Sequence, residues 1–322
     1  MAQAPFVINP GLTAIGIDFA GVNATQRGYI ADRVVPRVRT DAPLFRYASY
    51  PTEEAFTVYD TQVGRLSRLN EIEQSATEAT GAVLDYGLKS GIPYRDQMAA
   101  MSQSVPMDPK ARAVRDVIDK VQLAREIRCA GLLFSPGNYL AGYKATLTGT
   151  GQFSDLTNSD PVQVIIDAAA GMLVKPNVAV MGLEVFNVLR RHPKVSVALG
   201  GSQESGRYVP ADELAGILGV ERIEIGNTLQ QTNKRGQTFA SSRIWGKHLA
   251  LLNVPAVGAD SMVNNPAEPA FALTFQWGEK VAGEIADPEM GLWGGTWVKA
   301  GESLVERLVA QQAGYLFTNA IA

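Results

Sequence analysis

Residues 108–133 read DPKARAVRDVIDKVQLAREIRCAGLL, and this stretch predicts the longest single element of the chain. Asp108 is a typical N-cap residue, because its carboxylate can accept a hydrogen bond from a free amide of the first helical turn. Pro109 follows at the first helical position, where an N–H would have no helical partner. A helix over 110–133 would be about 35 Å long at 1.5 Å per residue. Its apolar residues at helical spacing form one stripe, made by Val114, Val117, Val121, Ala124 and Ile127.

The residues before this helix predict extended structure with little core of its own. Residues 1–41 form an arm that proline and glycine interrupt repeatedly. Residues 42–80 predict a polar β-hairpin ribbon, because apolar and polar residues alternate over 45–47 and again over 56–58. The segment 51–54 lies between these runs and has turn-forming residues. A two-stranded ribbon alone in water is marginally stable, so it must lie against another surface.

Alternation of apolar and polar residues predicts two half-buried strands, one on each side of the long helix in sequence. Ala82, Leu84, Tyr86 and Leu88 lie at alternate positions, and so do the large apolar residues of 271–277. Shorter apolar runs predict further strands over 249–254 and 315–317. Residues 303–310 fit a strand or a helix equally well.

The middle of the chain predicts an α/β unit with alternating helices and strands. Asp160-Pro161 repeats the cap signal and opens the first of these helices. His192-Pro193 ends another, because the residue before proline disfavours helical backbone angles. The Gly/Thr-rich stretch Thr146–Asp160 predicts a linker in front of this unit. We expect helices over 162–171, 183–191 and 210–218, and strands over 177–181 and 221–225.

The composition excludes several classes of protein. The 322 residues have a net charge of −3 and are 46% hydrophobic, so the chain buries a core but lacks the basic excess of a nucleic-acid binder. Its one cysteine, Cys129, excludes an internal disulfide and a cysteine-based metal cluster. No segment has the pattern of a signal peptide or the roughly 18 apolar residues of a membrane helix. We therefore expect a protein of a reducing cytoplasm, with no cofactor, metal or membrane partner.

The residues that usually carry catalysis are few. His192 ends a predicted helix, where a cation would favour the helix dipole, and His248 lies beside an apolar strand. Neither has a partner at metal-ligand spacing. Cys129 lies near the apolar stripe of the long helix, which predicts a buried, inert thiol. Gly149-Thr150-Gly151 lacks the lysine and the third glycine of a phosphate loop. We therefore expect structural roles and no catalytic residue.

The order of these elements resembles the major capsid protein fold of tailed bacteriophages, the Hong Kong 97 type. Asp85-Tyr86-Gly87-Leu88 with Ile92-Pro93 resembles the strand that leads these proteins toward a long spine helix. The segment 189–195, which reads LRRHPKV, is similar to a family helix end with a Leu-Arg-x-His-Pro pattern. The resemblance covers about 80–322 well and 1–80 more weakly. The evidence for the resemblance is the order of elements that the chain shares with the family, because no single motif is specific.

The resemblance implies an α+β protein of four parts. An N-terminal arm takes residues 1–41, and an extended β-hairpin, the E-loop, takes 42–80. A peripheral domain takes 81–149 and 256–310, with a sheet and the spine helix at about 109–133. An α/β axial domain takes 150–255 and 311–322.

The resemblance also implies a function. The chain would be a structural subunit that assembles with itself into pentamers and hexamers of an icosahedral virion capsid, in the cytoplasm of a host bacterium. The implied further partners are scaffolding, portal and decoration or cement proteins, and packaged double-stranded DNA held by non-specific contact. We expect the arm arginines and the ribbon to make the contacts between subunits, through Arg33, Arg37, Arg39, Glu53, Glu54, Arg65 and Arg68.

Two departures from the family pattern are informative. The first lysine of the chain is Lys89, so the ribbon cannot supply the lysine of the lysine–asparagine cross-link that locks some related shells. No long charged helical segment precedes the arm, so we expect an uncleaved subunit that uses a separate scaffolding protein if it needs one.

Two other hypotheses remain open. An encapsulin nanocompartment has the same architecture and holds a cargo enzyme instead of DNA; the polar ribbon and the phage-like α/β unit favour the virus. The second hypothesis is an α/β enzyme that uses residues 160–230. It predicts a pocket between this unit and the sheet, with a strongly perturbed carboxylate or histidine.

Overall fold

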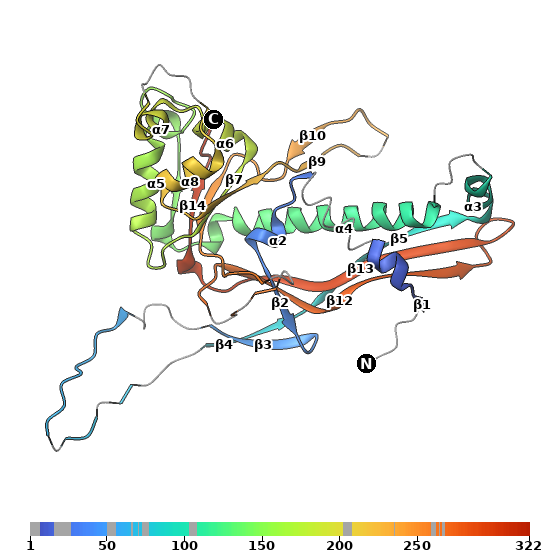
Figure 1. Ribbon diagram of the computed structural model, residues 1–322, viewed down its shortest axis with the longest axis horizontal. Coiled ribbons are helices and arrows are strands. Elements are labelled where there is room, and N and C mark those ends of the chain that lie inside the picture. Colours follow the sequence, from blue (N-terminus) through green and yellow to red (C-terminus); the bar gives the residue numbers. More distant parts are fainter. Residues whose placement is uncertain are drawn as a thin grey trace.

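The structure is a computed structural model, and it describes residues 7–15, 27–49, 56–65, 67–69, 71–72, 77–102, 108–201, 208–234, 236–258, 262–263, 265 and 268–322. Its two larger sheets have separate positions. One forms an elongated platform that runs along the long helix α4, and the other lies in an α/β unit at one end of that helix (Figure 1). The expected α+β class is confirmed.

Helix α4 (Pro109–Leu133) confirms the predicted long helix and its cap. The Asp108 carboxylate accepts a hydrogen bond from Lys110 N at 2.9 Å. The predicted stripe is wrong in its second half, because Ala124 and Ile127 are exposed. The buried face continues instead through Arg125, Glu126, Cys129 and Leu133. Two of these side chains are charged, so an apolar pattern could not identify them.

The platform sheet has the strand order β1–β12–β13–β5, and β2 also pairs with β12. The predicted strand over 271–277 is confirmed but continues to Asp287 past a bulge after Trp277. The ambiguous segment 303–310 is mostly strand. Glycine and charged residues interrupt the alternation beyond these two segments, so the rest of each strand was not predicted. The strands are β1 (Val7–Ile8), β2 (Arg37–Thr40), β5 (Leu84–Pro93), β12 (Ala272–Asp287) and β13 (Gly295–Leu308).

Strand β5 is an edge strand of the platform, and it confirms the strand predicted around 82–88. Its predicted half-burial is wrong for part of its length. Ile92 packs against α4, whereas Leu84 and Leu88 are 54% and 47% exposed. Helix α3 (Tyr94–Met101) follows directly, and none of its residues is buried.

The second sheet has the order β6–β14–β11–β7–β8 and carries the main apolar core of the α/β unit. The predicted helices and strands of this unit are confirmed to within a few residues. Helix α7 was not predicted, because His192-Pro193 both ends α6 and begins α7. The elements are β6 (Lys144–Thr146), α5 (Pro161–Ala170), β7 (Val178–Gly182), α6 (Leu183–Leu189), α7 (Pro193–Ala198), α8 (Ala211–Leu218), β8 (Arg222–Gly226), β11 (Leu249–Leu252) and β14 (Gly314–Thr318).

Short 3-10 turns connect these elements. The predicted linker Thr146–Asp160 contains one of them, and its Phe153 is fully buried, so this stretch packs against the second sheet. The turns are η2 (Pro136–Asn138), η3 (Ala141–Tyr143), η4 (Gly149–Gly151) and η5 (Gln311–Ala313).

Part of the N-terminal arm is built into the body, contrary to the expectation of an arm without a core. Ile30, Val34 and Val35 are buried against α4 and the second sheet. They belong to or flank the short helix α2 (Ala31–Val34). Strands β1 and β2 both pair with β12, the first antiparallel and the second parallel. These contacts were not predicted because they join residues far apart in sequence.

The ribbon starts as predicted and then differs. Strand β3 (Leu44–Ser49) pairs with β4 (Thr77–Ala82), so the expected second strand at 56–58 is not the partner of the first. Phe45 and Tyr47 pack on Phe275 of the platform, with ring centroids 4.4 and 5.2 Å away. The predicted turn at 51–54 lies outside the described residues.

The described residues between β3 and β4, over 56–65, 67–69 and 71–72, form what we call the excursion. Figure 1 shows it far from the rest of the chain. A second extension, here called the upper ribbon, is formed by β9 (Leu229–Gln231) and β10 (Ser241–Arg243). It leaves the junction of the two sheets on the α4 side (Figure 1). Its polar sequence contains no apolar alternation, so it was not predicted.

Candidate assembly surfaces

A buried cluster of charges joins the arm, helix α4 and the platform. Arg125 of α4 contacts the carboxylate of Asp32 in the arm. Arg37 of β2 lies between two carboxylates, with Nε 2.6 Å from Asp32 Oδ1 and Nη1 2.8 Å from Glu302 Oε2. The side chains of Arg125, Arg37 and Glu302 are almost fully buried. The cluster therefore ties three separate parts of the chain together.

The electrostatics of this cluster favour the charged forms. Burial by itself would raise the pKa of Asp32, but the guanidinium groups of Arg125 and Arg37 outweigh it and hold that pKa well below its usual range. The pKa of Glu302 is lowered in the same way, against the effect of burial, mainly by Arg37 and Arg125. Loss of one partner would leave a buried charge uncompensated, which costs about 3–5 kcal/mol in comparable sites.

The residues expected to contact other subunits lie in different environments. Arg37 is buried and forms ion pairs with Asp32 and Glu302 of its own chain, so it is not available to contact a neighbouring subunit. Arg33 reaches Glu224 at 3.1 Å but is still 58% exposed. Arg39 is 61% exposed, with Glu279 as a partner at 3.7 Å.

The remaining predicted residues belong to the segment between β3 and β4. Arg65 and Arg68 are exposed on the excursion. Glu53 and Glu54 lie outside the described residues. The structure therefore keeps Arg33, Arg39, Arg65 and Arg68 accessible to a partner, and it brings no two of them into one site.

The excursion also exposes large apolar side chains. Val58 is 94% and Leu69 76% exposed, and Phe56 and Ile72 are also more than half exposed. Apolar surface in water is unfavourable by about 25 cal/mol per Å², so such a segment gains stability when another surface covers it. None of these side chains belongs to the apolar clusters found among the described residues. A surface beyond these clusters would be needed to bury them.

The Glu126 carboxylate is a second buried link between parts of the chain. Its Oε1 accepts a hydrogen bond from Ala31 N at 2.7 Å, at the start of α2. Its Oε2 accepts one from Trp245 Nε1 at 2.9 Å, beside the second sheet. Burial raises the pKa of Glu126 to about 7, although these two hydrogen bonds act in the opposite direction. This role was not predicted, because a glutamate in a helix is usually exposed.

His192 has a structural role, as predicted. It precedes α7, where its Nδ1 accepts from Lys194 N at 3.2 Å. Its Nε2 therefore carries the proton and faces Ser159 Oγ at 3.1 Å, while that hydroxyl donates to Asp155 O at 2.6 Å. Burial lowers the pKa of His192, which opposes the stabilisation that a helix end would give to its cation. The imidazole cannot accept the Ser159 proton, which excludes a serine nucleophile activated by this histidine.

Two further candidates for reactive groups are engaged as well. His248 Nδ1 accepts from Asn319 N at 3.2 Å, and burial lowers its pKa. Cys129 is fully buried, as predicted, and burial raises the pKa of its thiol. A thiol that resists ionisation is a poor nucleophile.

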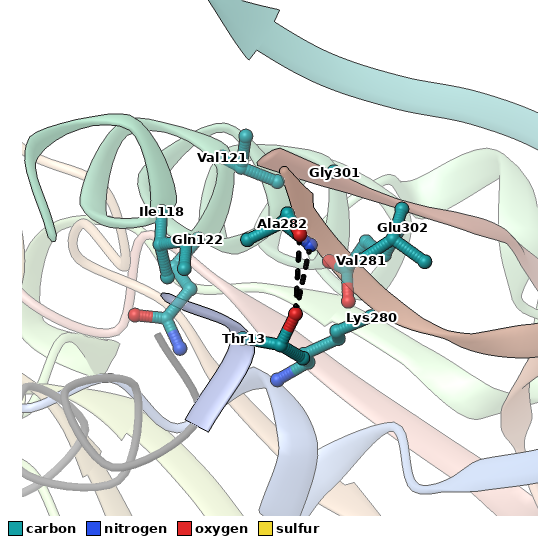
Figure 2. A pocket seen from close by; sticks show the side chains of 9 residues that line it. All are labelled: Thr13, Ile118, Val121, Gln122, Lys280, Val281, Ala282, Gly301 and Glu302. Carbon is teal, nitrogen blue, oxygen red and sulfur yellow. Dashed lines mark hydrogen bonds between the residues drawn. The ribbon is translucent and has the colours of Figure 1, made fainter. Parts of the chain in front are cut away.

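Figure 2 shows a small hollow between α4 and strands β12 and β13. Thr13 closes one side of it. The Thr13 hydroxyl donates to Ala282 O at 3.2 Å and accepts from Ala282 N at 3.3 Å (Figure 2). The free space is about 20 Å³, whereas a single water molecule needs about 10–15 Å³ on the same scale. The hollow is too small for an organic substrate.

A second hollow lies between the arm and α4 and includes Asp32, Arg125 and Glu126. Glu126 is a perturbed carboxylate of the kind that the enzyme hypothesis requires. The hollow lies outside residues 160–230, however, and both oxygens of Glu126 already accept hydrogen bonds. Within the described ranges, no group of three His, Cys, Asp or Glu side chains is arranged to hold a metal ion. None of the described helices is both long and apolar enough to cross a bilayer.

The whole chain is similar in sequence to a phage structural protein. It is 37% identical over 322 residues to the major capsid protein of Pseudomonas phage JBD67, and the match covers 100% of both chains. No family model matches the sequence.

Solved structures share the fold. A phage-related protein from Bordetella bronchiseptica superposes with a TM-score of 0.74 at 21% identity, over 99% of both chains. The capsid of cyanophage P-SCSP1u gives 0.52 at 12% identity, over 88% of this chain and 86% of that one. A holo-encapsulin complex from Synechococcus elongatus gives 0.51 at 10% identity, over 89% and 85%. At these identities the likeness shows the fold alone, and viral shells and nanocompartments share it.

Proposed function

This chain belongs to the family of phage major capsid proteins, and from that premise we propose that it closes into an icosahedral shell of pentamers and hexamers around double-stranded DNA. Its role as a structural capsid subunit follows from the full-length relative, and the proteins of this family are not enzymes. The closed shell, its symmetry and its contents are the proposed part.

The observation that carries this proposal is the excursion over 56–72. Four of its large apolar side chains are more than half exposed, and the segment lies far from the body of its own subunit. A monomer gains nothing from such a segment, whereas a neighbouring subunit would bury it. Contacts of this kind join different patches on successive copies, and they close into rings when the rotation between copies allows it.

We assign the parts of the subunit on the family pattern. The arm is 1–41, the E-loop 42–80, the peripheral domain 81–149 with 256–310, and the axial domain 150–255 with 311–322. Helix α4 and the platform strands β5, β12 and β13 then belong to the peripheral domain, and β7, β8, β11 and β14 of the second sheet belong to the axial domain. Candidate contacts between subunits are Arg33, Arg39, Glu53, Glu54, Arg65 and Arg68.

The proposed partners follow from charge and lysine content. A net charge of −3 suits a shell wall that touches packaged DNA weakly and without sequence preference. Because residues 1–88 contain no lysine, the E-loop cannot supply one for a covalent lock. Burial between subunits and cement proteins would then stabilise the shell. Scaffolding and portal proteins would take part in assembly, in the cytoplasm of the host bacterium.

An encapsulin-like nanocompartment is the second candidate, because the same fold occurs in the encapsulin complex. The contents of the particle separate the two functions. Double-stranded DNA protected from nuclease inside the particles is the result expected for a capsid. Particles that hold a protein cargo and no DNA would favour the nanocompartment.

Negative-stain electron microscopy of the purified chain, alone and co-expressed with the neighbouring genes, tests the proposed shell. We expect closed polyhedra, or pentameric and hexameric rings. Monodisperse particles of monomer or dimer size in both preparations would contradict it.

A further inference from the structure

We propose that β5 is a self-complementary edge, which pairs antiparallel with β5 of a second copy of the chain around a two-fold axis at Gly87. The inference rests on the proposed function, because an icosahedral shell places copies of one chain around two-fold axes. A contact of this kind uses the same surface on both copies, so that surface must be complementary to itself. Three properties of β5 meet this requirement: its open edge, its charges and its exposed leucines.

Strand β5 is the open edge of the platform. It ends the strand order, with β13 on its inner side, whereas the other side of the sheet is partly covered where β1 and β2 pair with β12. Most residues of Leu84–Pro93 are exposed, and no strand of the described chain pairs with the outer side of β5. Alternate residues of an edge strand direct their backbone groups away from the sheet, where a second strand can bind them.

The charges of β5 are self-complementary. Asp85 lies two residues before Gly87, and Lys89 lies two residues after it. When two identical strands pair antiparallel around Gly87, Asp85 of each copy is directly opposite Lys89 of the other. Opposite charges across a strand pair stabilise it, and like charges destabilise it. A pairing centred on Asp85 or on Lys89 would place like charges together, so the charges favour the register centred on Gly87.

Both charged side chains are exposed and lie on the same face of the platform. Successive side chains of a strand point to opposite faces, so Asp85 and Lys89 share the face away from α4. Contacts with β13 hold them there. Ser303 Oγ donates a hydrogen bond to Asp85 Oδ1, and Lys89 Nζ lies 4.2 Å from the ring centroid of Trp297. The two charges are therefore positioned beside the open edge before a partner arrives.

The other face of β5 has apolar side chains that the pairing would cover. This face lies against α4, because Ile92 packs on that helix and the Arg128 guanidinium of α4 lies 3.7 Å from the ring centroid of Tyr86. Leu84 and Leu88 lie on the same face and are about half exposed. In the proposed register, Leu88 of each copy is directly opposite Tyr86 of the other. An aliphatic side chain beside an aromatic ring is a favourable cross-strand pair.

The pairing would join two platforms into one continuous sheet. Because directly opposite residues share a face, α4 of both copies lies on the same side of that sheet. The two-fold axis is then perpendicular to the platform, which suits a shell whose two-fold axes are perpendicular to its wall. A lone lysine on an edge strand also protects monomers against such pairing. In β5, the acid four residues before the lysine and the exposed leucines favour a partner instead.

Disulfide formation between copies tests the register. The one native cysteine, Cys129, is fully buried, so it does not compete for a thiol placed on β5. Opposite residues of an antiparallel pair have Cα atoms about 4.5–5.5 Å apart, which a disulfide can span. In shells assembled from equal amounts of Asp85→Cys and Lys89→Cys subunits, we expect oxidation to give a covalent dimer of the two variants. Shells of either variant alone are the control, because their thiols would be about 14 Å apart along the strands.

The outcomes of this experiment separate the inference from the proposed function. Intact shells in which the mixture gives no more covalent dimer than the single variants would overturn the pairing of β5 and leave the capsid function in place. Failure of the wild-type chain to form any closed particle would remove the proposed function and this inference with it.

Charge reversal gives an independent test. Asp85→Lys should leave thermal unfolding of the unassembled subunit unchanged, because the side chain is exposed, and should lower the yield of shells by about tenfold, because lysines then face each other. Adding Lys89→Asp restores opposite charges with the signs exchanged, so this double variant should recover most of the yield. The matched control adds Lys175→Asp instead, at an exposed position outside β5, and has the same net charge. Recovery in this control, or no recovery in the first double variant, would overturn the inference.

Discussion

Arg125 makes the stability of the subunit depend on a buried charge cluster. Its guanidinium is held by Asp32 and lies 3.8 Å from Glu306, and its side chain is 3% exposed. We expect Arg125→Met to lower the free energy of unfolding by about 3–5 kcal/mol, because it leaves buried carboxylates with less compensation. Urea denaturation of the unassembled protein measures this. Arg39→Ala is the control; its exposed pair with Glu279 should contribute less than about 1 kcal/mol. Equal losses of unfolding free energy in the two variants would contradict a stabilising role of the buried charge cluster.

Glu126 links stability to pH. Its pKa rises from 4.5 to about 7 on folding, so the folded protein holds this proton more tightly than the unfolded chain does. That stabilisation is complete below about pH 4.5 and is lost as the pH rises through 7, and at 1.36 kcal/mol per unit it amounts to about 3 kcal/mol. Glu126→Gln is neutral at every pH and should flatten the change in unfolding free energy between pH 5 and 7.5. If the free energy of unfolding of this variant changes with pH as steeply as that of the wild type, the raised pKa of Glu126 is contradicted.

Sequence reasoning identified some of these residues and missed others for a physical reason. The cap at Asp108 and the buried Cys129 depend on local spacing, and both are as predicted. Arg37 was expected to face a neighbour, because nothing nearby in sequence shows that Glu302, 265 residues away, will meet it. Glu126 was missed for the same reason, since its partners come from the arm and the second sheet.

The excursion is an element that serves assembly and not folding. Strands β3 and β4 connect it to the body, through Phe45 and Tyr47 on Phe275. We therefore expect replacement of residues 56–72 by a short glycine-serine linker to leave the melting temperature of the unassembled subunit within about 2 °C, by the usual size of surface changes. The same variant should form no shells by electron microscopy. Normal shells, or an unfolded subunit, would contradict this division of roles.

Helix α3 gives a second test at this scale. It has eight residues, none of them buried, and it exposes Tyr94, Met98 and Met101. A helix shorter than about 12 residues is marginal in water without packing. We expect its amides to exchange rapidly with deuterium in the unassembled protein and slowly in shells. The amides of α5 serve as the control, because that helix packs in the core of the α/β unit, and they should be protected in both states. Slow exchange of α3 in both states would contradict a contact made on assembly.

Elements with a clear apolar period were predictable, and polar ones were not. Helix α4 and the elements of the α/β unit follow from their local patterns. The long hairpin of β12 and β13 was only half predicted, because the residues around its bulge and turn break the alternation. The upper ribbon and the partner of β3 were missed because both are polar, and pairing between distant strands leaves no local signal.

At the scale of the whole molecule, extension is the property that connects fold to function. The body is held together by two sheets, α4 and the buried charges, whereas the excursion, the upper ribbon and α3 lie outside any core of the described chain. The order of elements was enough to indicate the family, because each main element has a local signature. The contacts between subunits were not predictable to the same degree, since they depend on surfaces that meet only after assembly.

A cryo-electron microscopy map of particles formed by this chain tests the central claim most directly. We expect pentamers and hexamers in a closed icosahedral lattice, with residues 56–72 of each copy buried against the neighbouring copy. A closed particle in which these residues remain in solvent would contradict the role given to the excursion. A map with no closed lattice would contradict the capsid function itself.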